Sequence, residues 1–186
     1  MEVQWTNGAL TPDLDQARAA DTRDAAALAR DFKQAMRRLT AAVSIVATRE
    51  HASRYAMTAT ALSAVCAEPP AILVCINRGA TLYASLLRTR RFSVNLLHER
   101  QSDLIEPFSG KLAHDARFAF GAWRDADDLP VLDGAQATLL CRVDGGIRYG
   151  SHDVVIGRVD AVTVIESIAP LLWQDGGPAV ARALSA

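Results

Sequence analysis

The residues with the clearest chemical potential lie between Tyr55 and Arg78 of this 186-residue chain. The run Tyr55-Ala-Met-Thr-Ala-Thr-Ala-Leu-Ser-Ala-Val-Cys-Ala-Glu-Pro-Pro70 carries small and hydroxyl-bearing side chains where a strand ordinarily carries bulk. Small side chains let backbone amides approach a planar ligand closely, and hydroxyls can bond its polar rim. Arg78 follows the next apolar segment, and a guanidinium there can hold a phosphate. The run therefore predicts a cradle for a planar cofactor.

Metal chemistry is not indicated by the remaining reactive side chains. The three cysteines, Cys66, Cys75 and Cys141, are widely spaced and include no C-x-x-C pair. The four histidines are scattered and show no ligand spacing. We therefore expect buried, reduced cysteines and no metal site.

Composition excludes several classes of partner. The formal net charge is −1 and the isoelectric point is about 6.4, so there is no electrostatic reason to propose nucleic acid or an anionic membrane. No apolar run approaches the ~20 residues of a membrane helix, and the first residues lack the features of a signal peptide. We expect a cytoplasmic protein that binds neither nucleic acid nor membrane.

The chain is long enough for one domain, which we place at residues 23–186 after a loosely ordered N-terminal arm of residues 1–22. From Asp24 to Leu39, apolar residues recur at three- and four-residue steps, which predicts a helix that packs against a later part of the chain. Two shorter helices are predicted at 80–88 and 100–108.

Six segments rich in Val, Ile, Leu and Thr predict a mostly antiparallel sheet. They are residues 42–48, 56–63, 71–76, 92–97, 137–144 and 152–165. A barrel closed on itself fits many short strands because it leaves no exposed sheet edge. No G-x-G-x-x-G follows a strand, so a Rossmann dinucleotide site is not indicated.

Several of these pieces, in this order, resemble the short-chain flavin reductases that supply reduced flavin to two-component monooxygenases. The likeness runs from about Asp31 to about Trp173 and rests on 57–63, Pro69-Pro70, Asn77-Arg78-Gly79-Ala80-Thr81, 92–96, Arg117-Phe118 and 150–157. It implies a mainly β (α+β) fold, the FMN-binding split β-barrel, with an N-terminal helix and short peripheral helices. It also implies a homodimer with the flavin near the subunit interface.

The reaction implied by the resemblance is hydride transfer from NADH or NADPH to FMN, or to FAD, which then leaves for a partner monooxygenase. Met57, Thr58, Ala59 and Thr60 match the family segment that lies along the flavin ring. Fixed backbone N–H donors there would stabilise the negative charge that develops on the reduced ring.

The phosphate and ribityl end of the flavin is implied at three later places. Asn77, Arg78 and Thr81 match the family turn next to the phosphate, where an arginine offers a planar fork of donors. Ser63 and Cys66 match positions that offer hydroxyls and amides. Arg117 and Phe118 match a basic-Phe pair near the flavin. These residues form the predicted cofactor site.

Two further residues, Asn95 and His152, each have more than one possible role. Strand alternation makes Asn95 face away from Phe92, Val94 and Leu96, so it either contacts flavin or ties two strands together by a hydrogen bond. His152 matches the family's Gly-Ser/Asp-His pattern at the nicotinamide side. Hydride transfer needs no enzymic nucleophile, so the predicted role of His152 is to orient the reactants or stabilise charge.

Other interpretations remain open at this stage. One is a flavin-binding protein on the same barrel that performs no turnover. Another keeps the split barrel with a different reaction, as in relatives that oxidise pyridoxamine phosphate or act on haem. The basic cluster of Arg88, Arg90 and Arg91 is either a solvated helix end or an approach path for phosphates.

Overall fold

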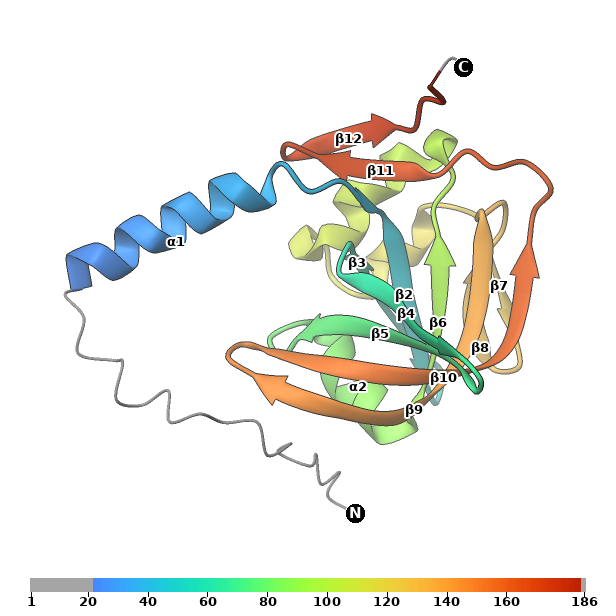
Figure 1. Cartoon of the computed structure of the whole chain (residues 1–186). Coiled ribbons are helices and arrows are strands. Elements are labelled where there is room, and N and C mark those ends of the chain that lie inside the picture. Colours follow the sequence, from blue (N-terminus) through green and yellow to red (C-terminus); the bar gives the residue numbers. More distant parts are fainter. Residues whose placement is uncertain (1–21, 185–186) are drawn as a thin grey trace.

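The computed structural model of the protein describes residues 22–184 (Figure 1). Strands form most of its regular structure, and the helices lie at the periphery. The predicted mainly β fold with short peripheral helices is confirmed. The predicted N-terminal arm falls on residues 1–21, which lie outside the described residues, and on Thr22, which begins helix α1.

The main element is one seven-stranded antiparallel sheet with the strand order β3-β2-β6-β9-β10-β5-β4. Its strands are β2 (Ser44–Glu50), β3 (Ser53–Ala59), β4 (Leu62–Ala67), β5 (Pro70–Asn77), β6 (Arg91–Leu96), β9 (Ala137–Tyr149) and β10 (His152–Val164). All six segments predicted to be strands belong to this sheet. Because every pairing is antiparallel, the expected mostly antiparallel architecture is also confirmed.

A two-residue connection makes this sheet curl. Strands β3 and β4 are the two edges of the sheet, yet only Thr60 and Ala61 join them. The edges can meet only if the sheet bends round on itself, so the result is a barrel that stays open along one seam. The prediction of one continuous strand over 56–63 was therefore wrong, because the chain turns a corner at its middle.

Smaller elements surround the barrel. Strands β1 (Ala41–Ala42), β11 (Leu171–Gln174) and β12 (Gly177–Val180) form one small sheet, and β7 (Trp123–Ala126) pairs with β8 (Leu129–Leu132). Helix α2 (Thr81–Thr89) lies against the barrel. The predicted helix over 100–108 is instead two short turns, η2 (Glu99–Leu104) and η3 (Pro107–Lys111), followed by η4 (Ala116–Ala119).

Two separate apolar cores lie on the two faces of the sheet. The first includes Val74, Leu86 and Phe92 and holds α2 against the barrel. The second includes Ile45 and Phe108 and holds η2, η3 and β11 against the other face. Because both faces of the central strands are buried, the sheet fixes α2 and η3 at the same time, and these elements bound the candidate site.

The sequence pattern predicts that the N-terminal helix packs against a later part of the chain. Helix α1 (Thr22–Met36) instead does not pack on the barrel. Its apolar stripe is exposed: Leu28 is 70% exposed and Phe32 is 59% exposed. Figure 1 shows the helix standing away from the body. Arg37, which directly follows α1, forms an ion pair of 2.8 Å with Asp175 in the turn between β11 and β12. This ion pair anchors the C-terminal end of α1.

Helix α2 is fastened to the end of β2 by Glu50. Its carboxylate accepts hydrogen bonds from Arg88 Nη2 at 2.7 Å and from Ser85 Oγ at 2.8 Å. Arg90 donates to the carbonyl of Val143, and Arg91 pairs with Asp127. The basic cluster therefore serves the end of α2, and this favours the helix-end interpretation over a path for phosphates.

The Glu50 clamp makes stability depend on pH. Hydrogen bonds from Arg88 and then Ser85 lower the pKa of Glu50 from 4.5 to about 2. A carboxyl whose folded pKa is lowered stabilises the fold above its unfolded pKa, and this contribution is lost as the pH falls toward the folded value. We expect Glu50→Gln to be less stable than wild type at pH 7, with the difference fading between about pH 4.5 and pH 2.

Urea unfolding across pH 2 to 7 measures this effect. Glu166→Gln is the matched control, because Glu166 is exposed and forms no ion pair with the described residues. A constant stability difference between Glu50→Gln and wild type over the whole range would contradict the assignment.

Candidate functional site

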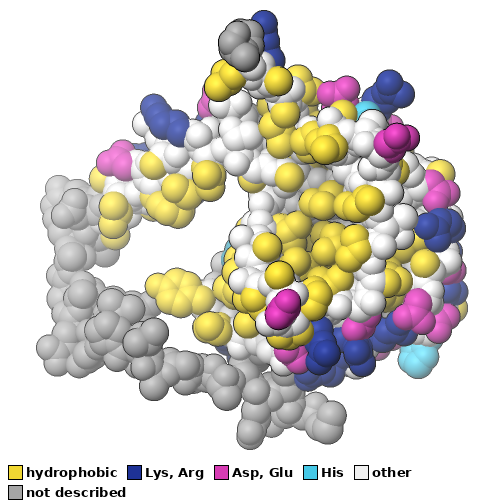
Figure 2. Space-filling view, turned by 45° about the vertical axis from the view of Figure 1, so that its right-hand side comes forward, with side chains coloured by type: hydrophobic (Ala, Val, Ile, Leu, Met, Phe, Trp, Pro, Cys, Tyr) yellow, Lys and Arg dark blue, Asp and Glu magenta, His cyan; other side chains and the backbone are white. Residues whose placement is uncertain are grey.

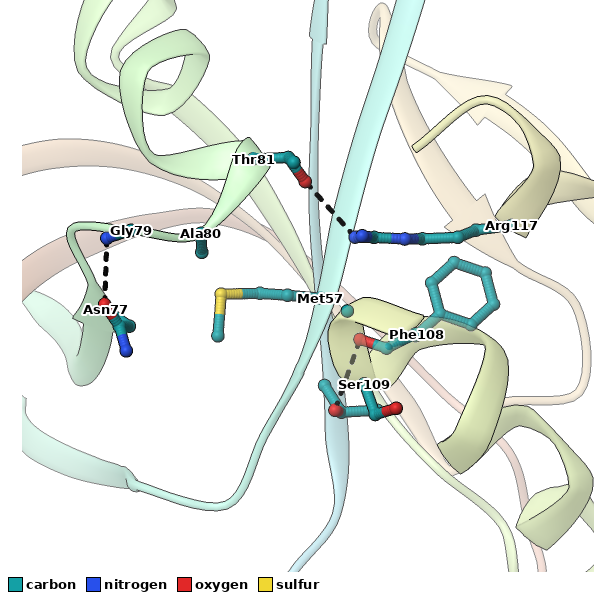
Figure 3. A pocket seen from close by; sticks show the side chains of 10 residues that line it. Met57, Asn77, Gly79, Ala80, Thr81, Phe108, Ser109 and Arg117 are labelled. Atoms are coloured by element: carbon teal, nitrogen blue, oxygen red, sulfur yellow. Dashed lines mark hydrogen bonds between the residues drawn. The ribbon is translucent and has the colours of Figure 1, made fainter. Parts of the chain in front are cut away.

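A cavity of about 340 Å³ opens between β3, the start of α2 and the η3 turn (Figure 3). Its lining residues come from four separate segments of the chain. They are Met57, Thr58, Asn77, Gly79, Ala80, Thr81, Phe108, Ser109, Gly110 and Arg117. Five of them, Met57, Thr58, Asn77, Thr81 and Arg117, were predicted as cofactor-binding residues from the sequence.

Arg117 is the charged group of this cavity, and it is only 3% exposed. Its Nη1 donates to the carbonyl of Ala56 at 2.7 Å and lies 3.2 Å from Thr81 Oγ1, while Nε and Nη2 both donate to the carbonyl of Leu112. Figure 3 shows its guanidinium directed toward Thr81. Arg117 therefore links β3, α2 and the loop after η3.

The charge of Arg117 has no carboxylate partner among residues 22–184. Burial lowers the pKa of its guanidinium from the usual value, but an arginine stays protonated at any working pH. Carbonyl dipoles solvate this cation without neutralising it. A buried cation of this kind gives the cavity a positive potential that favours an anionic ligand.

The N-terminus of α2 adds to this potential. Ala80 precedes the helix and offers no side-chain cap, and the first turn contains no acidic residue. The first N–H groups of a helix lack internal partners and carry the positive end of its dipole. Together with the Thr81 hydroxyl and Arg117, this end of the cavity has the chemistry of a phosphate site.

Arg78 was also predicted to hold a phosphate, but the structure engages it elsewhere. Its Nη2 donates to the carbonyl of Gly150 at 2.6 Å, and its backbone N–H donates to the carbonyl of Ser151 at 3.0 Å. Arg78 is not among the residues that line the cavity. These bonds tie the turn between β9 and β10 to the loop before α2.

His152 lies one strand from the cavity. It pairs with Asn77 across β10 and β5, and it is exposed. Its Nδ1 is 2.9 Å from Ser151 Oγ. Because residues directly opposite on antiparallel strands share one face of the sheet, the side chains of His152 and Asn77 are neighbours. The residue expected at the nicotinamide side is thus next to the predicted cofactor site.

A second cavity, of about 460 Å³, lies on the other side of the corner between β3 and β4. Thr60 and Ser63 line it, together with residues that lead to α1. Ala59 is buried and lines neither cavity. The small-residue run therefore contributes to two cavities, rather than to the wall of a single pocket.

Three further predicted site residues also line neither cavity. Cys66 is exposed on β4, and its thiol donates to the carbonyl of Pro69. The ring of Phe118 packs edge-to-face on Phe108 and Trp123 in the second core. The Arg117-Phe118 pair is thus divided, with only its arginine at the cavity.

Asn95 is the third, and it is fully buried. Its Nδ2 donates to the carbonyl of Ile45, and its Oδ1 accepts from Leu132 N at 2.9 Å and from Thr138 Oγ1 at 3.2 Å. These bonds link β2, β6, β8 and β9. Asn95 is the strand tie that the sequence left as the alternative to a flavin contact.

Sequence reasoning missed the side of the cavity formed by Phe108, Ser109 and Gly110. The dipeptide Ser109-Gly110 is a turn signal, and Gly110 adopts a positive φ of 99° that glycine tolerates. The carbonyl of Phe108 accepts a hydrogen bond from Thr58 Oγ1 at 3.4 Å. This turn signal directly follows the segment 100–108, which the sequence predicted as a helix.

Within residues 22–184, no group of three or more His, Cys, Asp or Glu side chains is arranged to hold a metal ion. None of the helices in the described part of the chain is long and apolar enough to cross a membrane.

Comparison with known proteins gives a consistent result. Residues 36–181 match the sequence model of the family described as "Flavin reductase like domain". The chain is 42% identical over 133 residues to "FMN reductase (NADH) RutF" of Bradyrhizobium diazoefficiens, an alignment covering 71% of this chain and 74% of the relative.

Two further relatives extend the comparison. The reductase component of an "FADH(2)-dependent resorcinol hydroxylase" of a Rhizobium species is 36% identical, over 78% of this chain and 83% of the relative. The solved structure of the flavin reductase PheA2 superposes with a TM-score of 0.75 at 27% identity, covering 83% of this chain and 98% of that one.

Proposed function

Because this chain belongs to the flavin reductase like family, we propose that it transfers hydride from NADH to FMN and supplies the reduced flavin to a monooxygenase. The relatives support both halves of the proposal. One is named an FMN reductase that uses NADH, and another is named the reductase component of a hydroxylase. The partner is accordingly a flavin-dependent monooxygenase.

The observation that carries the proposal is the buried Arg117 at the uncapped N-terminus of α2. FMN has a phosphate at one end and a planar ring at the other. The phosphate would bind Arg117, Thr81 and the first N–H groups of α2, since this end of the cavity lacks a negative charge of its own. The small-residue corner from Ala59 to Leu62 would lie beside the ring.

FMN, when bound, supplies the hydride acceptor. The chain's own residues would bind and orient the two reactants. Met57 and Thr58, which line the cavity, would lie against the flavin, and His152, one strand away, would position the nicotinamide. Because hydride transfer needs no enzymic nucleophile, the role we assign to His152 is to orient the reactants or to stabilise charge. In this proposal the chain accelerates hydride transfer by aligning the nicotinamide with the flavin.

The first prediction concerns turnover. Purified protein mixed with NADH and FMN should accelerate the loss of nicotinamide absorbance at 340 nm over a protein-free control. His152→Ala should bind FMN as wild type does but turn over about ten times or more slowly, because a misplaced donor loses the advantage of proximity. Arg158→Ala, an exposed change further along β10, is the control.

Two results would contradict this proposal. No acceleration with NADH or NADPH and with FMN or FAD would exclude a reductase. FMN binding without turnover, and with no effect of His152→Ala, would favour a flavin-binding protein that performs no catalysis.

The second prediction separates the two arginines. Arg117→Gln should weaken FMN by about 1.5 to 3 kcal/mol relative to riboflavin, because only FMN carries the phosphate. Arg78→Gln should change both affinities equally, because its guanidinium bonds the Gly150 carbonyl. Fluorescence titration of both flavins measures this. General damage to the fold lowers both affinities alike, and a selective loss of FMN in Arg78→Gln would assign the phosphate to Arg78 instead.

We also propose that the active form is a homodimer. The apolar stripe of α1 is exposed, and strand β4 is exposed on both faces at the edge of the sheet. Figure 2 shows hydrophobic side chains on α1 and on the facing surface of the body. A fifteen-residue helix is marginal in water alone, so α1 needs a permanent cover. A second copy of the chain can provide that cover symmetrically.

The third prediction tests the dimer. Light scattering on the full chain should give about twice the 20.0 kDa mass. The double variant Leu28→Asp/Phe32→Asp should shift the mass toward the monomer, because it buries charge in the interface. Arg30→Asp, on the opposite side of α1, should leave the dimer intact. A monomeric wild type, or a double variant that remains dimeric, would argue against this role of α1.

A further inference from the structure

A row of three side chains leads from the cavity across one face of the sheet. His152 on β10 pairs with Asn77 on β5 and, on its other side, with Tyr149 on β9. Directly opposite residues on antiparallel strands share a face and have Cβ atoms about 4.5–5.5 Å apart. Asn77 lines the cavity, so the row extends outward from it to Tyr149 over two strand spacings, about 10 Å.

Tyr149 differs from the other two tyrosines of the chain. Tyr55 stacks on His114 with ring centroids 4.6 Å apart, and Tyr83 donates a hydrogen bond to Asp153 at 2.8 Å. Tyr149 is 73% exposed, and its ring and hydroxyl have no such partner among the described residues. Its broad apolar face is free to stack on a planar ligand.

The other face of the same hairpin end is held firmly. Arg148 lies opposite Asp153, which is fully buried and accepts the hydrogen bond from Tyr83 of α2. Arg148 Nε lies 3.6 Å from the second carboxylate oxygen of Asp153. Arg78 holds the turn from the side of β5 through Gly150 and Ser151. The end of the β9–β10 hairpin that carries His152 and Tyr149 is therefore held in place on its other face.

An anchored row of this kind suits a ligand that has to be placed accurately. Hydride transfer requires the nicotinamide to lie against the flavin in a defined orientation, and preorganised contacts supply much of the rate. A tyrosine at the outer end of the row can stack on the donor while His152 lies nearer the flavin. Because His152 occupies the middle of the row, a planar ring bound to Tyr149 would lie over the exposed face beside His152.

We propose that Tyr149 is a contact for the reduced nicotinamide donor, beside His152 on the outer face of β9 and β10. The inference rests on the proposed function, because it takes the donor to be NADH. It adds a residue of the β9 end to a site otherwise built from β3, β5, α2, η3 and β10. The predicted role of Tyr149 is to bind the donor, not to bind the flavin.

The test compares Tyr149→Ala, Tyr149→Phe and the control Val164→Ala, which is an exposed apolar residue at the far end of β10. Tyr149→Ala should raise the KM for NADH about tenfold, while kcat and the dissociation constant of FMN stay within twofold of wild type. Tyr149→Phe keeps the ring and should retain most of the affinity. The control should behave as wild type.

An unchanged KM for NADH in Tyr149→Ala would overturn the inference. So would a raised KM accompanied by loss of the dimer mass in light scattering, because Tyr149 would then be a subunit contact. If the wild type fails to oxidise NADH, the proposed reaction fails separately. Fluorescence titration of flavin-free protein with NADH then decides: weaker binding by Tyr149→Ala supports the contact, and equal or absent binding by both proteins overturns it.

Discussion

The fold depends on a covalent constraint, the two-residue link of Thr60 and Ala61 between the two edges of one sheet. Seven strands cannot keep their first and last members that close without curling into a barrel. The run around this link is built mostly from alanine, threonine and serine, and the β4 side of it is exposed. Two cavities flank this corner, so the constraint that closes the barrel also creates its binding surface.

Arg117 gives one of these cavities a positive potential, which favours an anionic ligand. Three carbonyl and hydroxyl groups from separate segments stabilise its guanidinium, and no described carboxylate cancels its charge. Such a residue holds the loop after η3 and the start of α2 in place, and it also sets the sign of the potential in the cavity. The structural role of Arg117 and its proposed role in phosphate binding therefore coincide in one side chain, whereas Arg78 bonds the hairpin that carries His152.

The sequence predicted the strands of the barrel well because their composition and flanking turn residues are distinctive. It predicted the position of Asn95 less well, for a physical reason. Alternation along β6 identifies two faces, and only one of them was expected to be buried. In the barrel Phe92 and Val94 face the first core, while Asn95 faces the second, so both sides are interior. The strands at 123–126, 129–132, 171–174 and 177–180 are only four residues long and show too little periodicity to be recognised.

Helix α1 shows a different limit of prediction from the sequence, and its exposed apolar stripe has a thermodynamic consequence. Its stripe is regular, so the helix was predictable, but nothing in one subunit determines what the stripe contacts. A helix whose cover comes from another molecule is formed in proportion to how much of that molecule is present. In the proposed homodimer, dilution would then lower helix content as well as assembly, and the secondary structure of this chain would become a function of its own concentration.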